Sequence, residues 1–471
     1  MVGLACFISN RNPNERTQMK NNLIELPVSE LREALPGLGK LIGRKTTLPV
    51  LSAVRLARDK SGVLTLQATD LDSCATFTLK ERSEGPAGHV LVPYDRLQKA
   101  VKQSNSKIQL SMTNQDEVII RTYWRDTPME EKIGVPYHDD WPKLPVVETE
   151  AVALENRLRA TFKEAMECAS EDSSRQVINS VYLDVEDKNG HYVVATNGRH
   201  LFSANSFAFG FKQSVIIPTR KFLGWNGWWV EGDATLAIKP PGKQEDCPWL
   251  QFTANQWTFL TRGCAEQYPK WKNVVPTEDP KTTIIIPEQA VASVLEVLAR
   301  LPGHDGYNNS VTFNASKNTL VLSGCEKDQS QPVSVPIVEA QIKGVPGKVA
   351  LNREYVIRAL RFGLNTIDIL DELSPVVFQT EGKKMVVMPL RPGGDAPIKA
   401  STPVQPSTPP TQSTATTTPP TETTTQPAPE ERTTMPKQST TTTTTASTPA
   451  TTEAQESPLK LLVQQIENLR T

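Results

Sequence analysis

The sequence of 471 residues lacks the patterns that would identify an enzyme, a metal site or a membrane protein. It has no Cys-x-x-Cys pair and no Gly-x-Ser-x-Gly motif, and its histidines show no metal-ligand spacing. No apolar run approaches the roughly 20 residues that a membrane helix needs. The N-terminal VGLACFI lacks the basic segment of a signal peptide. We therefore expect a soluble, cytoplasmic protein with no catalytic residues, metal or cofactor.

The net charge argues against a chain that is basic as a whole, and the cysteine spacing argues against a disulfide framework or a zinc site. The formal net charge is −1, so the chain as a whole does not attract nucleic acid or acidic membranes. Any binding to DNA must come from positive charge gathered on one surface. The six cysteines are scattered and are interpreted as reduced thiols. The glycine-rich stretch at 36–47 is not a phosphate loop, because no Gly-Lys in it precedes Ser or Thr.

What the sequence does contain is a long internal repeat. An apolar strand ending in Ala-Thr lies at Leu66–Thr69 and Val193–Thr196, with a weaker copy at Val321–Cys325. A second element, an apolar strand followed by a proline and a helical stretch, recurs at 90–101, 215–225 and 284–295, with a variant at 349–360. Solenoid units run roughly 20–50 residues, so repeats this long are whole domains.

The helix signals divide each domain into two halves. One series begins near Ser29, Glu155 and Glu288, and a second begins near Tyr94, Thr219 and Asn352. Two interleaved series with matching offsets predict half-units that each combine a helix with a short antiparallel sheet. The expected fold class is α+β, with three topologically similar domains.

One predicted helix is interrupted. The stretch FLGWNGWWVEG at 222–232 places glycines and three tryptophans where the second helix of the middle domain belongs. Glycine costs ~1 kcal/mol per interior helix position relative to alanine, so a short or distorted helix is expected. We interpret Trp225, Trp228 and Trp229 as a local hydrophobic plug, with a base-stacking platform as the alternative.

Composition marks the end of the three domains. From about Pro392 the chain turns to Thr, Pro, Ser and Gln, which cannot form a packed core. At the end, Leu459, Leu462, Ile466 and Leu469 share one helical face. The predicted segments are a disordered arm or overcalled start at 1–18, domains at 19–146, 147–281 and 282–393, a disordered linker at 394–456 and an amphipathic helix at 457–471.

Positive charge is concentrated on some of the predicted helices and on one loop. The residues concerned are Arg44, Lys45, Arg96, Lys99, Lys102, Arg353, Arg358 and Arg361. In a near-neutral chain, basic helices suit a surface that follows phosphates without reading bases. A charged, solvated helix face without a ligand is an equally good interpretation of this pattern.

Several motifs, in order and at family-like spacing, resemble the bacterial DNA polymerase III beta subunits, the sliding clamps. They are TLPVLSAV (47–54), LQATDLD (66–72), RQVINSV (175–181), VVATNGRHLF (193–202), YPKWKNVVP (268–276) and MVVMPLRP (385–392). In that family two chains join head to tail into a closed ring, whose helices face double-stranded DNA. The resemblance implies a non-catalytic homodimeric processivity factor that binds DNA without sequence preference. It would also put the basic residues above on the DNA side.

The resemblance implies protein partners as well, namely the DNA polymerase III alpha subunit and the clamp loader. Their linear motifs would enter a pocket between the second and third domains, where apolar side chains accept leucine or phenylalanine anchors. By matching motifs, the wall of this partner-peptide pocket would be Ile178, Thr196, Gly198, Arg199, His200, Leu201, Pro269, Val274, Val386, Met388, Pro389, Leu390 and Arg391.

The chain departs from the family pattern in three places. Gly198-Arg199-His200 stands where the family usually has Gly-His-Arg, one helix is interrupted, and a long tail follows Arg391. A diverged paralogue for repair or translesion synthesis is therefore the alternative function. A surface protein with a Thr/Pro stalk is a second alternative, for which the sequons at Asn308 and Asn314 argue. The terminal helix contains QQIENL, a loose match to clamp-binding peptides, so it could dock in the pocket, bind another protein or fray.

Overall fold

The computed structural model of the chain describes residues 23–43, 48–114, 117–125, 127–136, 140–186, 190–230, 232–242, 247–304, 309–326 and 331–391. All of them belong to one unit, Met1–Gly394. Arg44 and Lys45, the segment 1–18, the linker 394–456 and the helix 457–471 lie outside the described residues. We refer to the predicted ranges 19–146, 147–281 and 282–393 as domains 1, 2 and 3.

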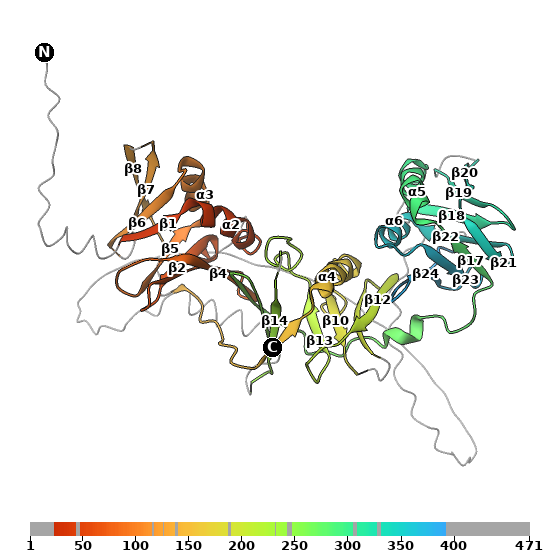
Figure 1. Cartoon of the computed structure of the whole chain (residues 1–471), viewed down its shortest axis with the longest axis horizontal. Helices are drawn as coiled ribbons and strands as arrows, with labels where there is room; N and C mark the ends of the chain where they lie inside the picture. The colour runs from red at the N-terminus through yellow and green to blue at the C-terminus, as the bar shows by residue number, and fades with distance from the viewer. Residues whose placement is uncertain are drawn as a thin grey trace, which may run out of the picture. The chain divides into compact units, whose positions relative to one another are not determined.

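Domain 1 contains the helices α2 (Val28–Leu38) and α3 (Tyr94–Gln103) and the 3₁₀ helix η1 (Pro49–Ser52) (Figure 1). Its strands are β1 (Leu23–Pro27), β2 (Ala53–Arg58), β3 (Val63–Thr69), β4 (Ser73–Arg82), β5 (Gly88–Pro93), β6 (Lys107–Asn114), β7 (Glu117–Trp124) and β8 (Thr127–Gly134).

Domain 2 contains the helix α4 (Asn156–Cys168) and, close to its end, the 3₁₀ helix η3 (Trp271–Val274). Its strands are β9 (Ala151–Leu154), β10 (Ser180–Asp184), β11 (His191–Thr196), β12 (His200–Phe207), β13 (Val215–Pro218), β14 (Ala234–Lys239), β15 (Trp249–Ala254) and β16 (Trp257–Arg262).

Domain 3 contains the helices α5 (Glu288–Arg300) and α6 (Arg353–Arg361). Its strands are β17 (Thr282–Ile285), β18 (Ser310–Ala315), β19 (Leu320–Gly324), β20 (Val333–Ile337), β21 (Gln341–Gly344), β22 (Gly347–Asn352), β23 (Thr366–Ile369), β24 (Val376–Thr380) and β25 (Lys383–Val387).

Five of the six predicted helix starts are confirmed, and the local sequence explains them. Pro27, Pro93 and Pro287 each occupy the position just before a helix, where the missing N–H of proline leaves no hydrogen bond unmade. Before α6, the Asn352 side chain instead accepts a hydrogen bond from the Glu354 N–H at 2.9 Å. The strand-proline-helix repeat is therefore a helix-start signal.

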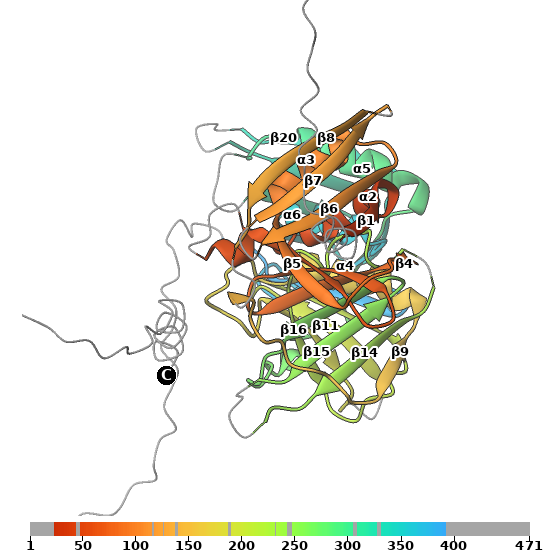
Figure 2. The same ribbon diagram turned by 90° about the vertical axis from the view of Figure 1, so that its left-hand side faces the viewer.

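The described strands form four antiparallel sheets, two of which cross domain boundaries. The strand orders are β5-β2-β3-β4-β16-β15-β14-β9, β13-β10-β11-β12-β25-β24-β23-β17-β21, β1-β6-β7-β8 and β20-β19-β18-β22. Figure 2 shows β16, β15, β14 and β9 lying side by side. The pair β4–β16 joins domain 1 to domain 2, and β12–β25 joins domain 2 to domain 3. The α+β class is confirmed.

The predicted helix near Thr219 does not form. Residues 219–230 contain turns, because the glycines leave too little helical preference to continue beyond one turn. Trp228 and Trp229 are only 2% and 3% exposed, and the Trp228 indole N–H donates to the Leu223 carbonyl at 2.9 Å. The hydrophobic plug is confirmed, and the base-stacking alternative is wrong for these two buried rings.

The plug also holds domain 1. Trp225 and Trp257 of domain 2 lie edge to face, with ring centroids 5.5 Å apart, against Gly37 of α2. A Cβ atom at Gly37 would come within 2.5 Å of the Trp225 ring and 2.6 Å of the Trp257 ring. The absence of a side chain at Gly37 is therefore what lets helix α2 approach the two indoles.

Gly37→Ala is expected to lower the free energy of unfolding by about 1–3 kcal/mol, because overpacking moves the indoles and helix α2 apart. Urea denaturation followed by tryptophan fluorescence measures this change. Gly224→Ala is the matched control, since a Cβ there meets nothing nearer than Met166 Cε at 3.6 Å. Equal losses in the two variants, or none in Gly37→Ala, would show that the contact does not limit packing.

Candidate functional site

The junction of β12 and β25 brings the two halves of the predicted pocket together. Leu201 lies opposite Val386 in this antiparallel pair. Beyond the end of β25, the Met388 N–H donates to the Arg199 carbonyl at 3.0 Å. Segments separated by almost two hundred residues in the sequence are thus hydrogen-bonded side by side, as the resemblance implies.

Leu201 and Val386 belong to an apolar cluster that we call the junction cluster. Its buried members are Val194, Leu201, Ile216, Tyr268, Trp271, Val377 and Val386. Tyr268 stacks on Tyr182 with ring centroids 4.5 Å apart, and its hydroxyl is buried with no hydrogen-bond partner among the described residues. The two aromatic residues of the YPKW motif therefore belong to the junction cluster, whereas only Pro269 of these four residues is a predicted wall residue.

The junction cluster has an exposed apolar rim. Val274 and Met388 are each 46% exposed, and Pro269 is exposed as well. Ile178 is buried, whereas Pro389 and Leu390 are half-buried. A buried apolar floor beside exposed apolar side chains is the arrangement that accepts the apolar anchors of a peptide.

The loop between β11 and β12 is fixed by its own side chains. Thr196 Oγ1 donates to the His200 carbonyl at 2.6 Å and accepts from the Gly198 N–H at 3.0 Å. Asn197 Oδ1 accepts from the N–H groups of Arg199 and His200 at 2.9 and 3.1 Å. Gly198 has φ +86°, which favours glycine. These bonds fix the loop that carries the exposed Arg199 and the buried His200.

His200 is 2% exposed and lies between domains 2 and 3. Its ring packs on Tyr355 at 4.2 Å between centroids, and Nε2 lies 3.4 Å from Nη1 of Arg358. Burial, assisted by the charge of Arg358, lowers the pKa of His200 from 6.5 to about 3. A neutral imidazole thus occupies a position where the resemblance leads us to expect arginine.

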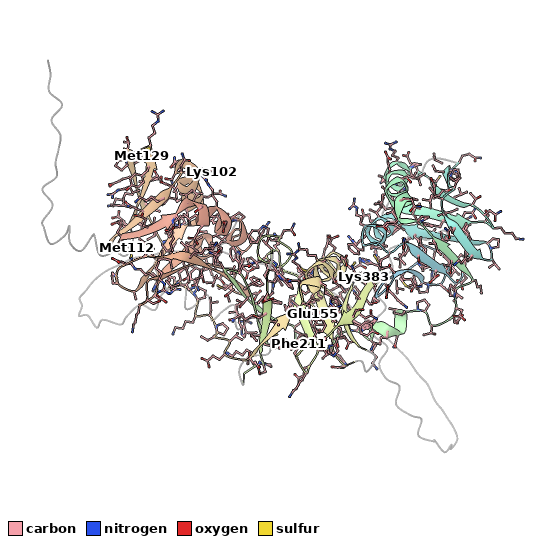
Figure 3. All side chains as sticks on the ribbon, viewed as in Figure 1. Lys102, Met112, Met129, Glu155, Phe211 and Lys383 are labelled. Carbon is pink, nitrogen blue, oxygen red and sulfur yellow. The ribbon has the colours of Figure 1, made fainter. Side chains whose placement is uncertain are left out.

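An ion pair connects the same two domains. Nζ of Lys383 on β25 lies 2.9 and 2.7 Å from the carboxylate oxygens of Glu164 on α4. Figure 3 shows Lys383 beside α4. Burial raises the pKa of Glu164, although Lys383 opposes this shift. The pair, together with the β12–β25 strand pairing, holds domains 2 and 3 in register.

The predicted DNA-binding residues have different environments. Arg96 and Lys99 on α3 both donate to Glu131 of β8, at 2.9 and 3.0 Å, so part of their charge is already neutralised. Lys102 and Arg361 are exposed, and Arg358 is half-buried beside His200. Lys102 lies on the surface of domain 1 in Figure 3. Arg44 and Lys45 lie outside the described residues.

Arg353 is not available to DNA, and its assignment as a DNA contact is wrong. Its side chain is 1% exposed, and the guanidinium donates to the carbonyls of Leu301, Pro302 and Ser310. Leu301 and Pro302 follow the last turn of α5, where free carbonyls attract a cation. The spacing along the sequence already indicates that Arg353 is buried, because it shares the buried face of α6 with Val356 and Leu360.

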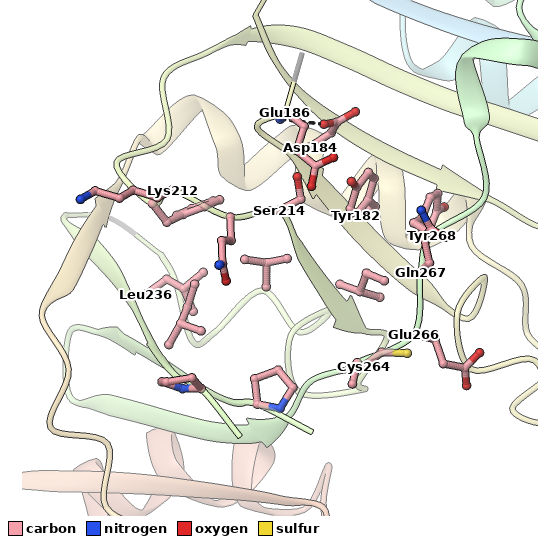
Figure 4. Close-up of a pocket in the computed structure, with 18 of the residues that line it drawn as sticks. Tyr182, Asp184, Glu186, Lys212, Ser214, Leu236, Cys264, Glu266, Gln267 and Tyr268 are labelled. Atoms are coloured by element: carbon pink, nitrogen blue, oxygen red, sulfur yellow. Dashed lines mark hydrogen bonds between the residues drawn. The ribbon is translucent and has the colours of Figure 1, made fainter. Parts of the chain in front are cut away.

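A separate surface pocket of about 1420 Å³ opens on domain 2 (Figure 4). Its lining includes Tyr182, Ile216 and Tyr268 of the junction region, but of the predicted wall only Pro269. Asp184 lies in it and accepts a hydrogen bond from the Trp271 indole N–H at 2.9 Å. The pocket and the predicted wall therefore share Pro269 alone, whereas the pocket and the junction cluster share Ile216, Tyr268 and Trp271.

The described residues contain no group of His, Cys, Asp and Glu side chains that could hold a metal ion. Within the same residues, no helix is both long and apolar enough to cross a membrane.

The repeated half-units, joined through their sheets, have the arrangement of a clamp-type fold. Residues 27–145 match the family model of the DNA polymerase III beta subunit, N-terminal domain. The beta sliding clamp of Halalkalibacterium halodurans is 22% identical over 340 residues, covering 69% of this chain and 86% of that protein. Over its N-terminal domain and along most of its length, the chain is therefore similar to DNA polymerase III beta subunits, the beta sliding clamps.

Solved structures show the same fold. The DNA polymerase sliding clamp from Bacillus subtilis has a TM-score of 0.68 at 18% identity, covering 79% of this chain and 99% of that chain. A sliding clamp from Bartonella birtlesii, bound to griselimycin, has a TM-score of 0.67 at 20% identity, covering 78% and 99%.

Proposed function

We propose that this protein is a DNA sliding clamp. Two copies close into a ring around double-stranded DNA, and the ring tethers the DNA polymerase III alpha subunit and is opened by the clamp loader. The role is non-catalytic, acts in the cytoplasm and requires no cofactor. The observation that carries the proposal is the way in which the half-units pair.

The two sheets that cross domain boundaries follow one rule. In each, one half-unit sheet follows the first helix of a domain. Its edge strand pairs with the edge strand of the sheet that follows the second helix of the next domain, or the plug that replaces that helix. The pairs are β4 with β16 and β12 with β25. Each junction merges two half-unit sheets into one longer sheet.

Two half-unit sheets in the chain are not used by this rule. They are β1-β6-β7-β8 of domain 1 and β20-β19-β18-β22 of domain 3. The rule pairs β20 of one copy with β8 of the next, head to tail, and a second copy completes the circle. Both strands are edges whose unpaired backbone groups invite such pairing. The prolines in them, Pro128 and Pro336, are tolerated at sheet edges.

DNA binding in this proposal is weak and blind to sequence. The exposed Lys102 and Arg361, with Arg44, Lys45, Arg96, Lys99 and the half-buried Arg358, would supply phosphate contacts around the hole. Enclosure, rather than affinity, would then keep the ring on DNA. Weak phosphate contacts exchange rapidly, which permits sliding.

The test is retention on DNA of defined topology. After loading by a clamp loader onto nicked circular DNA, the protein is expected to co-elute with the circle and to be lost when the circle is linearised. Light scattering of the free protein is expected to give twice the chain mass. A strict monomer at micromolar concentration, or equal retention on both DNA forms, contradicts the proposal.

We propose that the junction cluster and its rim are the partner-peptide pocket. The Bartonella relative was solved with griselimycin bound, which supports the proposal that a protein of this fold has a site for a ligand. Met388→Asp is expected to weaken binding of a DNA polymerase III alpha-subunit motif peptide at least tenfold. A carboxylate facing an apolar anchor loses hydration worth several kcal/mol. Fluorescence anisotropy measures the peptide Kd, and light scattering is expected to show an unchanged dimer.

The matched control is Val146→Asp, which places the same charge at a residue that is 69% exposed in the segment between domains 1 and 2. Its peptide affinity is expected to equal that of the parent protein. Unchanged affinity in Met388→Asp would remove this residue from the pocket. Leu201→Asp is less informative, because Leu201 is buried in the β12–β25 junction and its loss would disturb the fold.

A diverged paralogue is the second candidate, favoured by the neutral His200 in the pocket loop. Peptides from repair or translesion polymerases would then bind more tightly than the alpha-subunit peptide. A Kd comparison across such peptides separates the two functions.

A further inference from the structure

Two cysteines lie at the open end of the β15–β16 pair. The register places Trp249 opposite Arg262 as the last ladder pair. One residue further, the Gly263 N–H donates to the Pro248 carbonyl at 2.8 Å, while Pro248 has no N–H to return. The ladder ends because of this proline. Continuing the register by one more step sets Cys247 opposite Cys264.

The bonding pattern makes this a close pair. Because Gly263 and Pro248 form a hydrogen-bonded pair, the next opposed pair is of the non-hydrogen-bonded kind, with Cα atoms ~4.5 Å apart. Disulfides span Cα separations of roughly 4.4–6.8 Å. Cys247 lies at a bend that directly precedes this pair, and it is near enough to Cys264 for its charge to act on the Cys264 thiol. The Cys264 N–H donates to the Ile216 carbonyl at 3.3 Å, away from Cys247, as the pattern requires.

The preceding pair of the same kind shows that opposed side chains meet on this face. Trp249 and Arg262 lie opposite each other, and the Arg262 guanidinium carbon is 5.2 Å from the Trp249 ring centroid. Cys247 and Cys264 are each two residues further along their strands, so their side chains lie on that same face.

We propose that Cys247 and Cys264 form a site of reversible disulfide modification. A small disulfide oxidant such as oxidised glutathione supplies the chemistry. One thiolate attacks the oxidant, forming a mixed disulfide and releasing one glutathione thiolate. The second cysteine thiolate attacks the protein sulfur of that mixed disulfide and releases the second. Two protein thiols are oxidised, two protons leave, and one glutathione disulfide is reduced to two thiols.

Access distinguishes this pair from other cysteines. Cys247 and Cys264 are half-buried, whereas Cys74 and Cys168 are buried in the core. Burial raises the pKa of the Cys264 thiol, and the neighbouring Cys247 contributes to the rise. Exchange proceeds through the thiolate, so the reaction is slow at neutral pH and accelerates in mildly alkaline solution.

The disulfide would anchor one end of a functional segment. Cys264 lines the domain 2 pocket and begins the stretch that contains Tyr268, Pro269 and Trp271 (Figure 4). The bond closes the loop between the two cysteines, which removes chain entropy from the unfolded state. It is therefore expected to stabilise the protein as well as to restrain this stretch.

The full-length reduced protein is incubated with oxidised glutathione, quenched with a thiol-blocking reagent and mapped by mass spectrometry. A Cys247–Cys264 cross-linked peptide, lighter by two hydrogens and reversed by dithiothreitol, is the expected product in most molecules. Its rate of formation is expected to rise roughly tenfold per pH unit below the thiol pKa. The matched control Cys325→Ser, at an exposed cysteine, is expected to leave the product unchanged.

Cys247→Ser and Cys264→Ser are each expected to abolish the cross-link and to retain glutathione on the remaining cysteine. The two variants check each other if one folds poorly. Mixed disulfides at both cysteines without closure, or cross-linking that involves Cys325 instead, overturns the proposal. Because the measurement needs neither DNA nor a partner, its outcome is independent of the proposed clamp function.

Discussion

Arg353→Met is expected to lower the free energy of unfolding by at least ~3 kcal/mol. The substitution removes a buried cation that donates to the carbonyls of Leu301, Pro302 and Ser310, and hydrogen bonds to a charged group are each worth ~1.5–3 kcal/mol. The carbonyls at the end of α5 then remain buried without donors. Urea denaturation monitored by circular dichroism measures the loss.

Arg361→Met is the matched control on the same helix. Arg361 is exposed, and its replacement is expected to change stability by less than ~0.5 kcal/mol while weakening retention on DNA at raised salt. The opposite result, a stable Arg353→Met protein with weakened DNA retention, would return Arg353 to the DNA-binding set. The comparison thus separates a cation that caps a helix from one that can face phosphate.

Acid is expected to destabilise the protein through His200. Its pKa is 6.5 ordinarily and about 3 in the fold, so between these values the unfolded state binds a proton that the folded state does not. The stability contributed by the neutral ring is complete above pH 6.5 and declines as the pH falls toward 3. The expected slope is ~1.4 kcal/mol per pH unit, or about 4–5 kcal/mol over the whole interval.

The measurement compares the pH dependence of urea unfolding in the parent protein and in His200→Gln. Other groups also titrate in this interval, so the difference between the two slopes isolates His200. His89→Gln, at a half-buried histidine in domain 1, is the matched control for the loss of an imidazole. Parallel curves for the parent and His200→Gln would mean that His200 is protonated in the fold.

The sequence predicted features that depend on local chemistry. A proline or asparagine before an amphipathic stretch marks the starts of α2, α3, α5 and α6, because capping is decided within a few residues. The internal repeat alone predicted that each domain is divided into two half-units. The placing of Leu201 beside Val386 depended on the resemblance, since the two are far apart in the chain.

Features that depend on tertiary packing were missed. Tyr268 and Trp271 look like loop residues in the sequence, but they cover the outer face of strands β10 and β11, whose position no local pattern gives. Arg353 was counted as one more basic residue, although its spacing from Val356 and Leu360 already put it on the buried face. The contact between Gly37 and two indoles likewise required the arrangement of domains 1 and 2.

The plug in place of a helix has a consequence for the charge on helix α4. Residues 221–230 contain a single charged side chain, Lys221. Two cations of α4 bind this segment: Arg159 donates to the Trp229 carbonyl at 2.9 Å, and the Lys163 ammonium donates to the Asn226 side chain. A turn thus offers these cations a free backbone carbonyl and an amide oxygen. The plug acts as a neutral anchor that fixes the positions of two positive charges.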